Sequence, residues 1–112
     1  MQVKAISKDT GMPAGKMRPL ADMVRGKKVD DALNLLRYQP SPKARLIAKV
    51  VRSAAANAEN NFQMEPADLI VVKINVDVAR SMRRFRARSR GRASPIHKNS
   101  SHVTVIVADQ EG

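Results

Sequence analysis

The sequence predicts an α+β fold, with three helices packed on a small antiparallel three-stranded sheet and a long projecting β-hairpin. Apolar residues recur at intervals of three and four through the middle of the chain, which is typical of helices with one buried face. On either side of that region they recur at every second position, which is typical of half-buried strands. The order strand, helices, strand, basic segment, strand favours a sheet packed on helices.

The length of the chain limits its domain organisation. With 112 residues it has the size of one ordinary domain, about 100 to 150 residues, and is too short for a second full core. We therefore expect a single domain over residues 1–112, with an Arg-rich hairpin arm over residues 79–101 inside it. The rest of the chain is called the body.

Three segments have the period of a strand. Residues 2–8 alternate weakly, and residues 102–108 alternate Val103, Val105 and Val107 with Thr104 and Ile106. The segment 69–78 is predicted to turn Val72, Ile74, Val76 and Val78 to one face and Lys73, Asn75 and Asp77 to the other. These segments supply the three strands of the expected sheet.

The first helix is predicted over residues 13–25. Its apolar face is formed by Met17, Leu20, Met23 and Val24, and Gly26 is placed to end it as a left-handed cap. Pro19 is unfavourable inside a helix, because its ring clashes with the preceding turn at a cost of about 3 kcal/mol or more. We therefore expect a kink or a late helix start near Arg18.

Two further helices follow. The second places Val29, Ala32, Leu33 and Leu36 on one face, has Asp30 and Asp31 in its first turn, and should stop before Pro40. Ser41 as cap and Pro42 at the first helical position open the third. Its small apolar residues are Ala44, Ile47, Ala48, Val51, Ala54, Ala55 and Ala58. Arg45, Lys49 and Arg52 form a separate basic stripe, either a solvated outer face or a surface for a polyanion.

The composition excludes several classes of function. The formal net charge of +11 and the pI of about 11.0 indicate a partner with dense negative charge, nucleic acid or an anionic membrane. Because there is no Cys and only two His, no thiolate metal site, Cys nucleophile or His-rich centre is expected, and we predict no metal, cofactor or enzymatic activity. No apolar run approaches the ~20 residues of a membrane span, so a soluble, cytoplasmic protein is expected.

The positive charge is concentrated in one segment. Between Asp77 and Asp109 there is no acidic residue, while eight basic residues supply +8: Arg80, Arg83, Arg84, Arg86, Arg88, Arg90, Arg92 and Lys98. The flanking strands must join, and residues 89–93 with Gly91 are the natural turn. Each arm of such a hairpin has about 12 residues, or roughly 40 Å at about 3.3 Å per residue. Arg pairs bidentately with phosphate, which favours seating on nucleic acid.

Other interpretations remain open at this point. The basic segment could be a disordered loop that only aids solubility. A DNA-binding regulator could place the ribbon in a groove, although no surplus apolar face for a dimer is evident. A protein of the membrane surface is disfavoured, because the segment lacks the apolar face that such elements bury.

Several motifs in order resemble the bacterial-type large-subunit ribosomal protein twenty-two family. They are residues 21–29 (ADMVRGKKV), 53–60 (SAAANAEN), 81–88 (SMRRFRAR), 91–93 (GRA) and 101–105 (SHVTV). The resemblance is collinear over nearly the whole chain. It implies a structural protein that is monomeric within the large ribosomal subunit and contacts large-subunit rRNA, neighbouring ribosomal proteins and the nascent polypeptide. Its hairpin would line the peptide exit tunnel.

The resemblance and the charge pattern together give the candidate sites. The expected rRNA-binding residues are Lys16, Arg18, Arg25, Lys27, Lys28, Arg45, Lys49 and Arg52 in the body, and Arg80, Arg83, Arg84, Arg86, Arg88, Arg90, Arg92 and Lys98 in the arm. The expected tunnel-facing tip consists of Arg88, Ser89, Arg90, Gly91, Arg92 and Ala93. Ala79 and Arg80 stand where the family often has a Gly, and Pro95 predicts an irregular returning arm.

Overall fold

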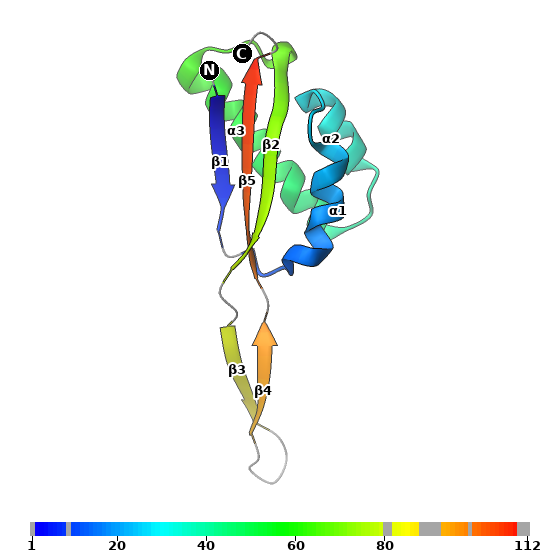
Figure 1. Ribbon diagram of the computed structural model, residues 1–112, viewed down its shortest axis with the longest axis vertical. Helices are drawn as coiled ribbons and strands as arrows, with labels where there is room; N and C mark the ends of the chain where they lie inside the picture. The colour runs from blue at the N-terminus through cyan, green and yellow to red at the C-terminus, as the bar shows by residue number, and fades with distance from the viewer. Residues whose placement is uncertain (1, 9, 80–81, 88–92, 99, 110–112) are drawn as a thin grey trace.

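The computed structural model describes residues 2–8, 10–79 and 100–109, and the backbone of residues 82–87 and 93–98 (Figure 1). The elements are β1 (Gln2–Ser7), α1 (Ala14–Val24), α2 (Val29–Arg37), α3 (Pro42–Phe62), the short 3-10 helix η1 (Pro66–Asp68), β2 (Leu69–Val78), β3 (Met82–Ala87), β4 (Ala93–Lys98) and β5 (Ser101–Asp109). This order confirms the predicted α+β fold with its three helices and three-stranded sheet.

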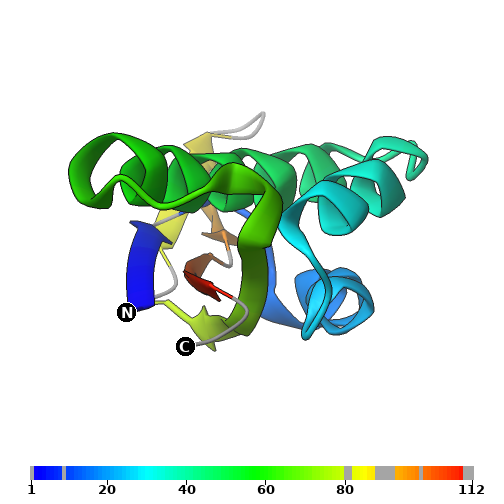
Figure 2. The same ribbon diagram turned by 90° about the horizontal axis from the view of Figure 1, so that it is seen from above.

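The sheet of the body has the strand order β1-β5-β2, and both neighbouring pairs are antiparallel. The last strand of the chain therefore lies in the centre, between the first strand and the strand that follows the helices. Seen from above, α3 crosses one face of this sheet, α1 lies beyond the edge strand β2, and none of the described helices covers the opposite face (Figure 2). The sheet is thus buried on one side only, which accounts for the alternating pattern of its strands.

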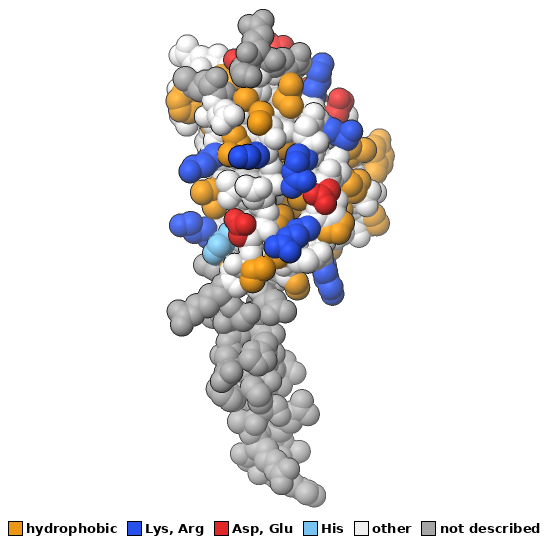
Figure 3. Space-filling view, in the orientation of Figure 1, with side chains coloured by type: hydrophobic (Ala, Val, Ile, Leu, Met, Phe, Trp, Pro, Cys, Tyr) orange, Lys and Arg blue, Asp and Glu red, His pale blue; other side chains and the backbone are white. Residues whose placement is uncertain are grey.

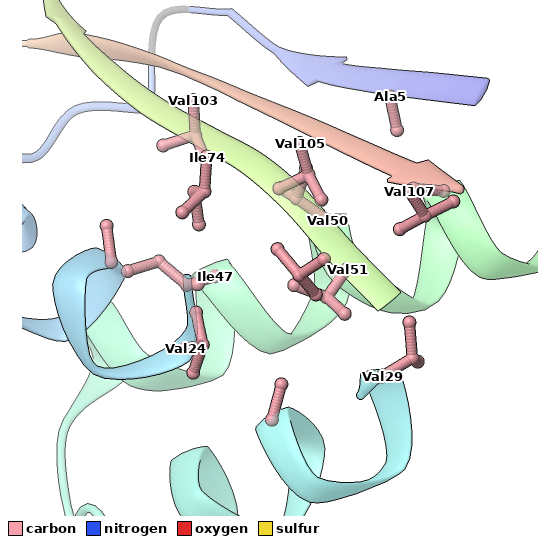
Figure 4. Close-up of a cluster of buried hydrophobic side chains, with 14 of the residues drawn as sticks. Ala5, Val24, Val29, Ile47, Val50, Val51, Ile74, Val103, Val105 and Val107 are labelled. Carbon is pink, nitrogen blue, oxygen red and sulfur yellow. The ribbon is translucent and has the colours of Figure 1, made fainter. Parts of the chain in front are cut away.

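The core lies between the sheet and α3 (Figure 4). Val103, Val105 and Val107 of β5 are fully buried, as are Ile47 and Val51 of α3. Burying a side chain of this size contributes about 1.5–3 kcal/mol relative to leaving it exposed. The period-two and three-to-four patterns of the sequence thus meet in one cluster, as predicted.

One strand departs from its predicted alternation. The pairing of β2 with β5 shifts register between Val71 and Lys73, so Val72 is an extra residue in the strand. The buried positions change phase there, from Val71 before the shift to Ile74 and Val76 after it. The prediction that Val72 shares a face with Ile74 and Val76 is wrong, because the shift turns Val72 to the other side, where it is 40% exposed. Val78 keeps the phase of Ile74 and Val76, as predicted, but is 71% exposed at the end of the strand.

The ends of the helices follow the sequence signals. The Ser41 hydroxyl accepts a hydrogen bond from the Lys43 backbone N–H at 3.2 Å, which confirms Ser41 as the N-cap of α3. Gly26 has a φ of 82°, the left-handed conformation predicted for it, but the C-cap of α1 is Arg25 in an extended conformation, and the Gly26 N–H donates to β2 instead of to the helix. At the end of α3 the same conformation falls on Gln63, with a φ of 53°.

Of the two alternatives expected at Pro19, a kink or a late helix start, the late start is wrong, because α1 begins at Ala14 and contains Pro19. A proline in this position removes the hydrogen bond to the carbonyl of Gly15, one turn earlier. Both residues are exposed, so water can satisfy that carbonyl. Met17 and Ala21, on either side of Pro19, are buried and hold the helix against the core across the missing bond.

The strands β3 and β4 form a separate two-stranded antiparallel sheet within the hairpin arm. Their register runs without a shift from Met82 opposite Lys98 to Ala87 opposite Ala93. The irregularity expected at Pro95 is therefore absent from the pairing. Each strand of a two-stranded sheet has one unpaired edge, and a proline is tolerated there because no neighbouring strand needs its N–H.

The molecule measures 63 × 27 × 18 Å, and its radius of gyration of 17.0 Å exceeds the ~13 Å of a compact domain of this size.

Candidate nucleic-acid interface

The base of the hairpin arm is fixed to the body by a small polar cluster. The hydroxyls of Thr10 and Ser101 are 2.8 Å apart, and the Ser101 hydroxyl also donates to the sulfur of Met17 at 3.3 Å. The backbone N–H of Gly11 donates to the Ser100 hydroxyl at 3.0 Å. Ser100 and Ser101 are both buried. Because buried polar groups are stable only when they are paired, this cluster holds the loop before α1 against the start of β5.

Two of the predicted rRNA-binding arginines also bind the sheet. The side chain of Arg25 donates to the carbonyl of Ile74 at 2.7 Å, and Arg18 donates to the carbonyl of Val76 at 3.3 Å. Arg25 is further paired with Asp22, one turn earlier on α1. These carbonyls lie on the outer edge of β2, which none of the described strands covers. Arg18 and Arg25 therefore satisfy a free sheet edge, while both remain exposed to a partner.

The chain after α1 continues to cover that edge. The backbone N–H of Gly26 donates to the carbonyl of Val71, and the N–H of Val71 donates to the carbonyl of Lys27, both at 2.8 Å. The two bonds hold the segment with Lys27 and Lys28 beside β2, with both lysine side chains exposed. Together with the exposed Tyr38 they line a shallow groove beside α2. Lys16 is exposed on α1.

The basic stripe predicted on α3 is divided between two places. Arg45 and Arg52 line a groove of about 600 Å³ between α2 and α3. Lys49 lines a different hollow, between α3 and the edge strand β1. Arg37, which was not among the predicted binding residues, joins Arg45 and Arg52. The sequence showed only that Arg37 lies at the end of the predicted second helix. The packing of α2 against α3 places it in the same groove as Arg45.

The open face of the sheet carries further cations that the sequence analysis missed. Lys4 on β1 and Lys73 on β2 are both exposed, and both are register partners of Ile106 on the central strand. They therefore flank one residue from two sides. Figure 3 shows Lys and Arg side chains spread over this face of the body, with a few acidic side chains between them. The signal was present in the alternation, which already put Lys4 and Lys73 opposite the buried positions.

The arm carries the remaining candidates. Arg83, Arg84 and Arg86 lie in β3, Lys98 in β4, and Ala93 of the predicted tip is the first residue of β4. The other predicted arm and tip residues lie outside the residues that the structure describes: Arg80, Arg88, Ser89, Arg90, Gly91 and Arg92.

The described residues contain neither a metal-binding cluster nor a helix that could span a membrane. Within residues 2–8, 10–79 and 100–109, no three His, Asp or Glu side chains gather closely enough to hold a metal ion. No helix in the part of the chain that the structure describes is long and apolar enough to cross a bilayer. What the arrangement offers instead is exposed cationic side chains on several faces of a small rigid body, next to a ribbon rich in arginine. Such a distribution suits the phosphates of a nucleic acid.

Comparison with known proteins decides the family. Residues 5–108 match the family described as ribosomal protein L22p/L17e. The chain belongs to this family. A large ribosomal subunit protein uL22 from Dehalococcoides mccartyi is 60% identical over 109 residues, which cover 97% of this chain and 100% of the relative. Proteins of the same name from Herpetosiphon aurantiacus and a Roseiflexus species are 50% and 49% identical over 111 residues.

Membership in the L22p/L17e family confirms the resemblance drawn from the sequence motifs. The chain is a structural protein of the large ribosomal subunit and acts in translation; it is not an enzyme. The expected location on the cytoplasmic ribosome follows from the same membership. The aligned length leaves only a few residues at each end of this chain outside the family match.

Proposed function

We propose that this large-subunit protein binds rRNA through its body and its hairpin arm, and that the arm lines the nascent-peptide exit tunnel. The observation that carries the proposal is that the positive charge is concentrated in a segment that lies outside the three-stranded sheet of the body. Eight basic and no acidic residues fall between Asp77 and Asp109, and that stretch includes a ribbon that forms a sheet of its own. Arginine ribbons of this kind pair with phosphates through bidentate hydrogen bonds.

The body would bind the surface of the rRNA, and the arm would extend from it between RNA segments. Exposed cations of the body, such as Lys16, Lys27 and Lys28, would neutralise phosphates on the rRNA surface. The arm 79–101 would enter between RNA segments and neutralise phosphates that otherwise repel one another. Its tip, residues 88–93, would face the emerging peptide. A lone two-stranded ribbon is marginally stable in water, so contact with RNA would also stabilise the arm.

The first test is the retention of the chain on RNA as salt is raised. Large-subunit rRNA and duplex DNA of equal charge are immobilised separately, and retention of the full chain is measured between about 50 and 200 mM salt, where purely electrostatic binding falls steeply. We expect stronger retention on the rRNA at the upper end. Equal retention on both would reduce the proposal to generic polyanion binding, and stronger retention on the DNA would favour a DNA-binding ribbon.

The second test addresses the tunnel. A photo-reactive residue replaces Ser89 at the expected tip, ribosomes carrying this variant are stalled during synthesis of a labelled polypeptide, and cross-linked products are separated. We expect a cross-link between this chain and the nascent peptide. A matched variant with the same photo-reactive residue at Glu59, an exposed position on α3, should give none. Labelling from Glu59 but not from position 89 would contradict the proposed orientation.

A further inference from the structure

The groove between α2 and α3 combines three arginines with an apolar wall. Arg37 comes from the last turn of α2, and Arg45 and Arg52 come from the first half of α3. Leu33 and Ala48 supply apolar lining and pack against the buried core behind them. No Asp or Glu is among the described residues that line the groove. Its volume of about 600 Å³ lies within the ~300–1,000 Å³ of typical small-ligand sites.

The side chains of the three arginines have no partner among the described residues. Within the part of the chain that the structure describes, the one ion pair joins Arg25 to Asp22, on a different helix. The guanidinium groups of Arg37, Arg45 and Arg52 make no hydrogen bond or ion pair with these residues. Like charges that converge on a hollow with apolar walls produce a focused positive potential there. An anion would relieve their mutual repulsion, and guanidinium groups are best matched to phosphate.

The apolar wall of the groove favours an anion that also carries a flat, uncharged group. A phosphate of an RNA duplex would need only exposed cations, as on the open face of the sheet. A hollow with Leu33 and Ala48 in its wall also accepts a flat, largely uncharged group beside the phosphate. An unpaired nucleotide has both parts, because its base can leave the stack and lie against an apolar surface or a guanidinium plane. An acidic peptide would bring carboxylates but no flat apolar group of this size.

A second groove on the same helix supports a single-stranded path. Asn34 of α2 lines both grooves, and the second also contains Lys27, Lys28 and Tyr38. Tyr38 is 80% exposed, so its ring is accessible to a base that stacks on it. Asp31 is the one carboxylate among the described residues of this second lining. Cations and an aromatic ring in sequence are the pattern of sites that follow a single strand.

We propose that the groove between α2 and α3 holds an unpaired nucleotide of large-subunit rRNA, with its phosphate on Arg37, Arg45 and Arg52 and its base or ribose against Leu33 and Ala48. The proposal rests on rRNA binding as proposed above and names the surface and the form of RNA involved. The proposal adds Arg37 to the RNA-binding residues. The sequence did not indicate this role, because Arg37 lies on α2, outside the basic stripe of α3.

The binding experiment uses the full chain and purified large-subunit rRNA at one fixed salt concentration. The groove variant replaces Arg37, Arg45 and Arg52 by Gln. The control variant replaces Lys4, Lys8 and Lys73 by Gln, which removes the same charge from exposed positions outside the groove. We expect the groove variant to bind at least tenfold more weakly than the control. Equal loss in both variants would overturn the proposal, because it would leave only net charge.

A third variant separates failure of this proposal from failure of rRNA binding itself. Replacing Arg83, Arg84 and Arg86 of the arm by Gln should weaken binding whether or not the groove is used. If the arm variant loses affinity and the groove variant matches its control, the groove proposal falls and the proposed function stands. If no variant changes the affinity, rRNA binding through these surfaces falls as well.

The occupant is identified by cross-linking from within the groove. A photo-reactive residue at Asn34 is incorporated into the full chain, assembled large subunits are irradiated, and the cross-linked partner is sequenced. A cross-link to a nucleotide that lies outside RNA duplexes supports the proposal. A cross-link to a neighbouring protein, to paired nucleotides only, or to nothing overturns it. The unfolding midpoint of each variant, measured beside wild type, shows that altered binding does not reflect an unfolded body.

Discussion

The body and the arm both contain antiparallel strands, but different forces account for them. In the body, the apolar side of the sheet packs against α3, and Val105 and Ile47 are fully buried. The strands β3 and β4 pair only with each other in a sheet of two, a size that is marginally stable in water. Their segment carries eight positive charges and no negative one. The body thus has the means to fold alone, whereas the arm is suited to a polyanionic partner.

The difference also shows how the two regions would divide the work on the ribosome. A rigid body offers fixed cations whose spacing the core determines, as for Arg18 and Arg25 at the edge of β2. The two-stranded ribbon instead extends the molecule, which measures 63 Å along its longest axis. Removing parts of each region should therefore affect different measurements.

Deleting Arg83 to Ser94 should have the largest effect, and on RNA affinity alone. The deletion removes six arginines, so the slope of log affinity against log salt should fall by about four to five. The free energy of unfolding of the body should change by about 1 kcal/mol or less, because closure entropy varies slowly with loop length. Titration with large-subunit rRNA at several salt concentrations and urea unfolding measure the two quantities. Loss of cooperative unfolding would break the division into body and arm.

Replacing Ile47 by Ala should destabilise the body by about 2–5 kcal/mol, because it leaves a cavity between α3 and the sheet. Urea unfolding measures the loss. Val72→Ala is the matched control: the register shift places Val72 on the exposed side, so its loss should be about 0.5 kcal/mol or less. A similar cost at both positions would mean that β2 keeps one alternation throughout, contrary to the bulge.

Replacing Ser101 by Ala should destabilise the junction of body and arm by about 1–3 kcal/mol, because Thr10 and Met17 lose their buried partner. Ser7→Ala on β1 is the control, since the Ser7 hydroxyl makes no hydrogen bond within the described residues. Hydrogen exchange of the Ala79 amide, which donates to the Ser100 carbonyl at 3.0 Å, reports on the junction directly. Unchanged exchange there would show that the polar cluster does not fix the base of the arm.

Replacing Gln63 by Gly should have the smallest effect and the opposite sign. Gln63 has a φ of 53°, a conformation that costs a residue with a Cβ about 1 kcal/mol and glycine almost nothing. A gain of up to about 1 kcal/mol in unfolding free energy is expected. Gln63→Ala keeps the Cβ and should give no such gain. An equal gain from both substitutions would place the cause outside the backbone conformation.

Much of the body could be predicted because its signals are local. Ser41 and Pro42 identify the start of α3, Gly26 the end of α1, and the valines of β5 its buried face. Pro19 misled the prediction, because its effect on a helix was weighed without the contacts of Met17 and Ala21 that keep α1 in place. Val72 misled it as well, since a bulge belongs to a pair of strands and leaves one strand's alternation looking regular.

The candidate site was only partly predictable for a related reason. The basic residues of the arm and body can be read directly from the sequence. Which of them lie side by side in the folded protein cannot be read in that way. Arg45 and Lys49, one turn apart on α3, face different hollows, while Arg37 and Arg52, fifteen positions apart, share one.

The sequence by itself determined the fold class, the start of α3, the buried valines of β5 and the concentration of positive charge between Asp77 and Asp109. Each of these depends on residue type and spacing within one segment. The tertiary structure alone decided the bulge at Val72, the use of Arg18 and Arg25 to cover the edge of β2, and the grouping of Arg37 with Arg45 and Arg52. These depend on the register and the packing of segments far apart in the chain, which are set by the free energy of the whole core.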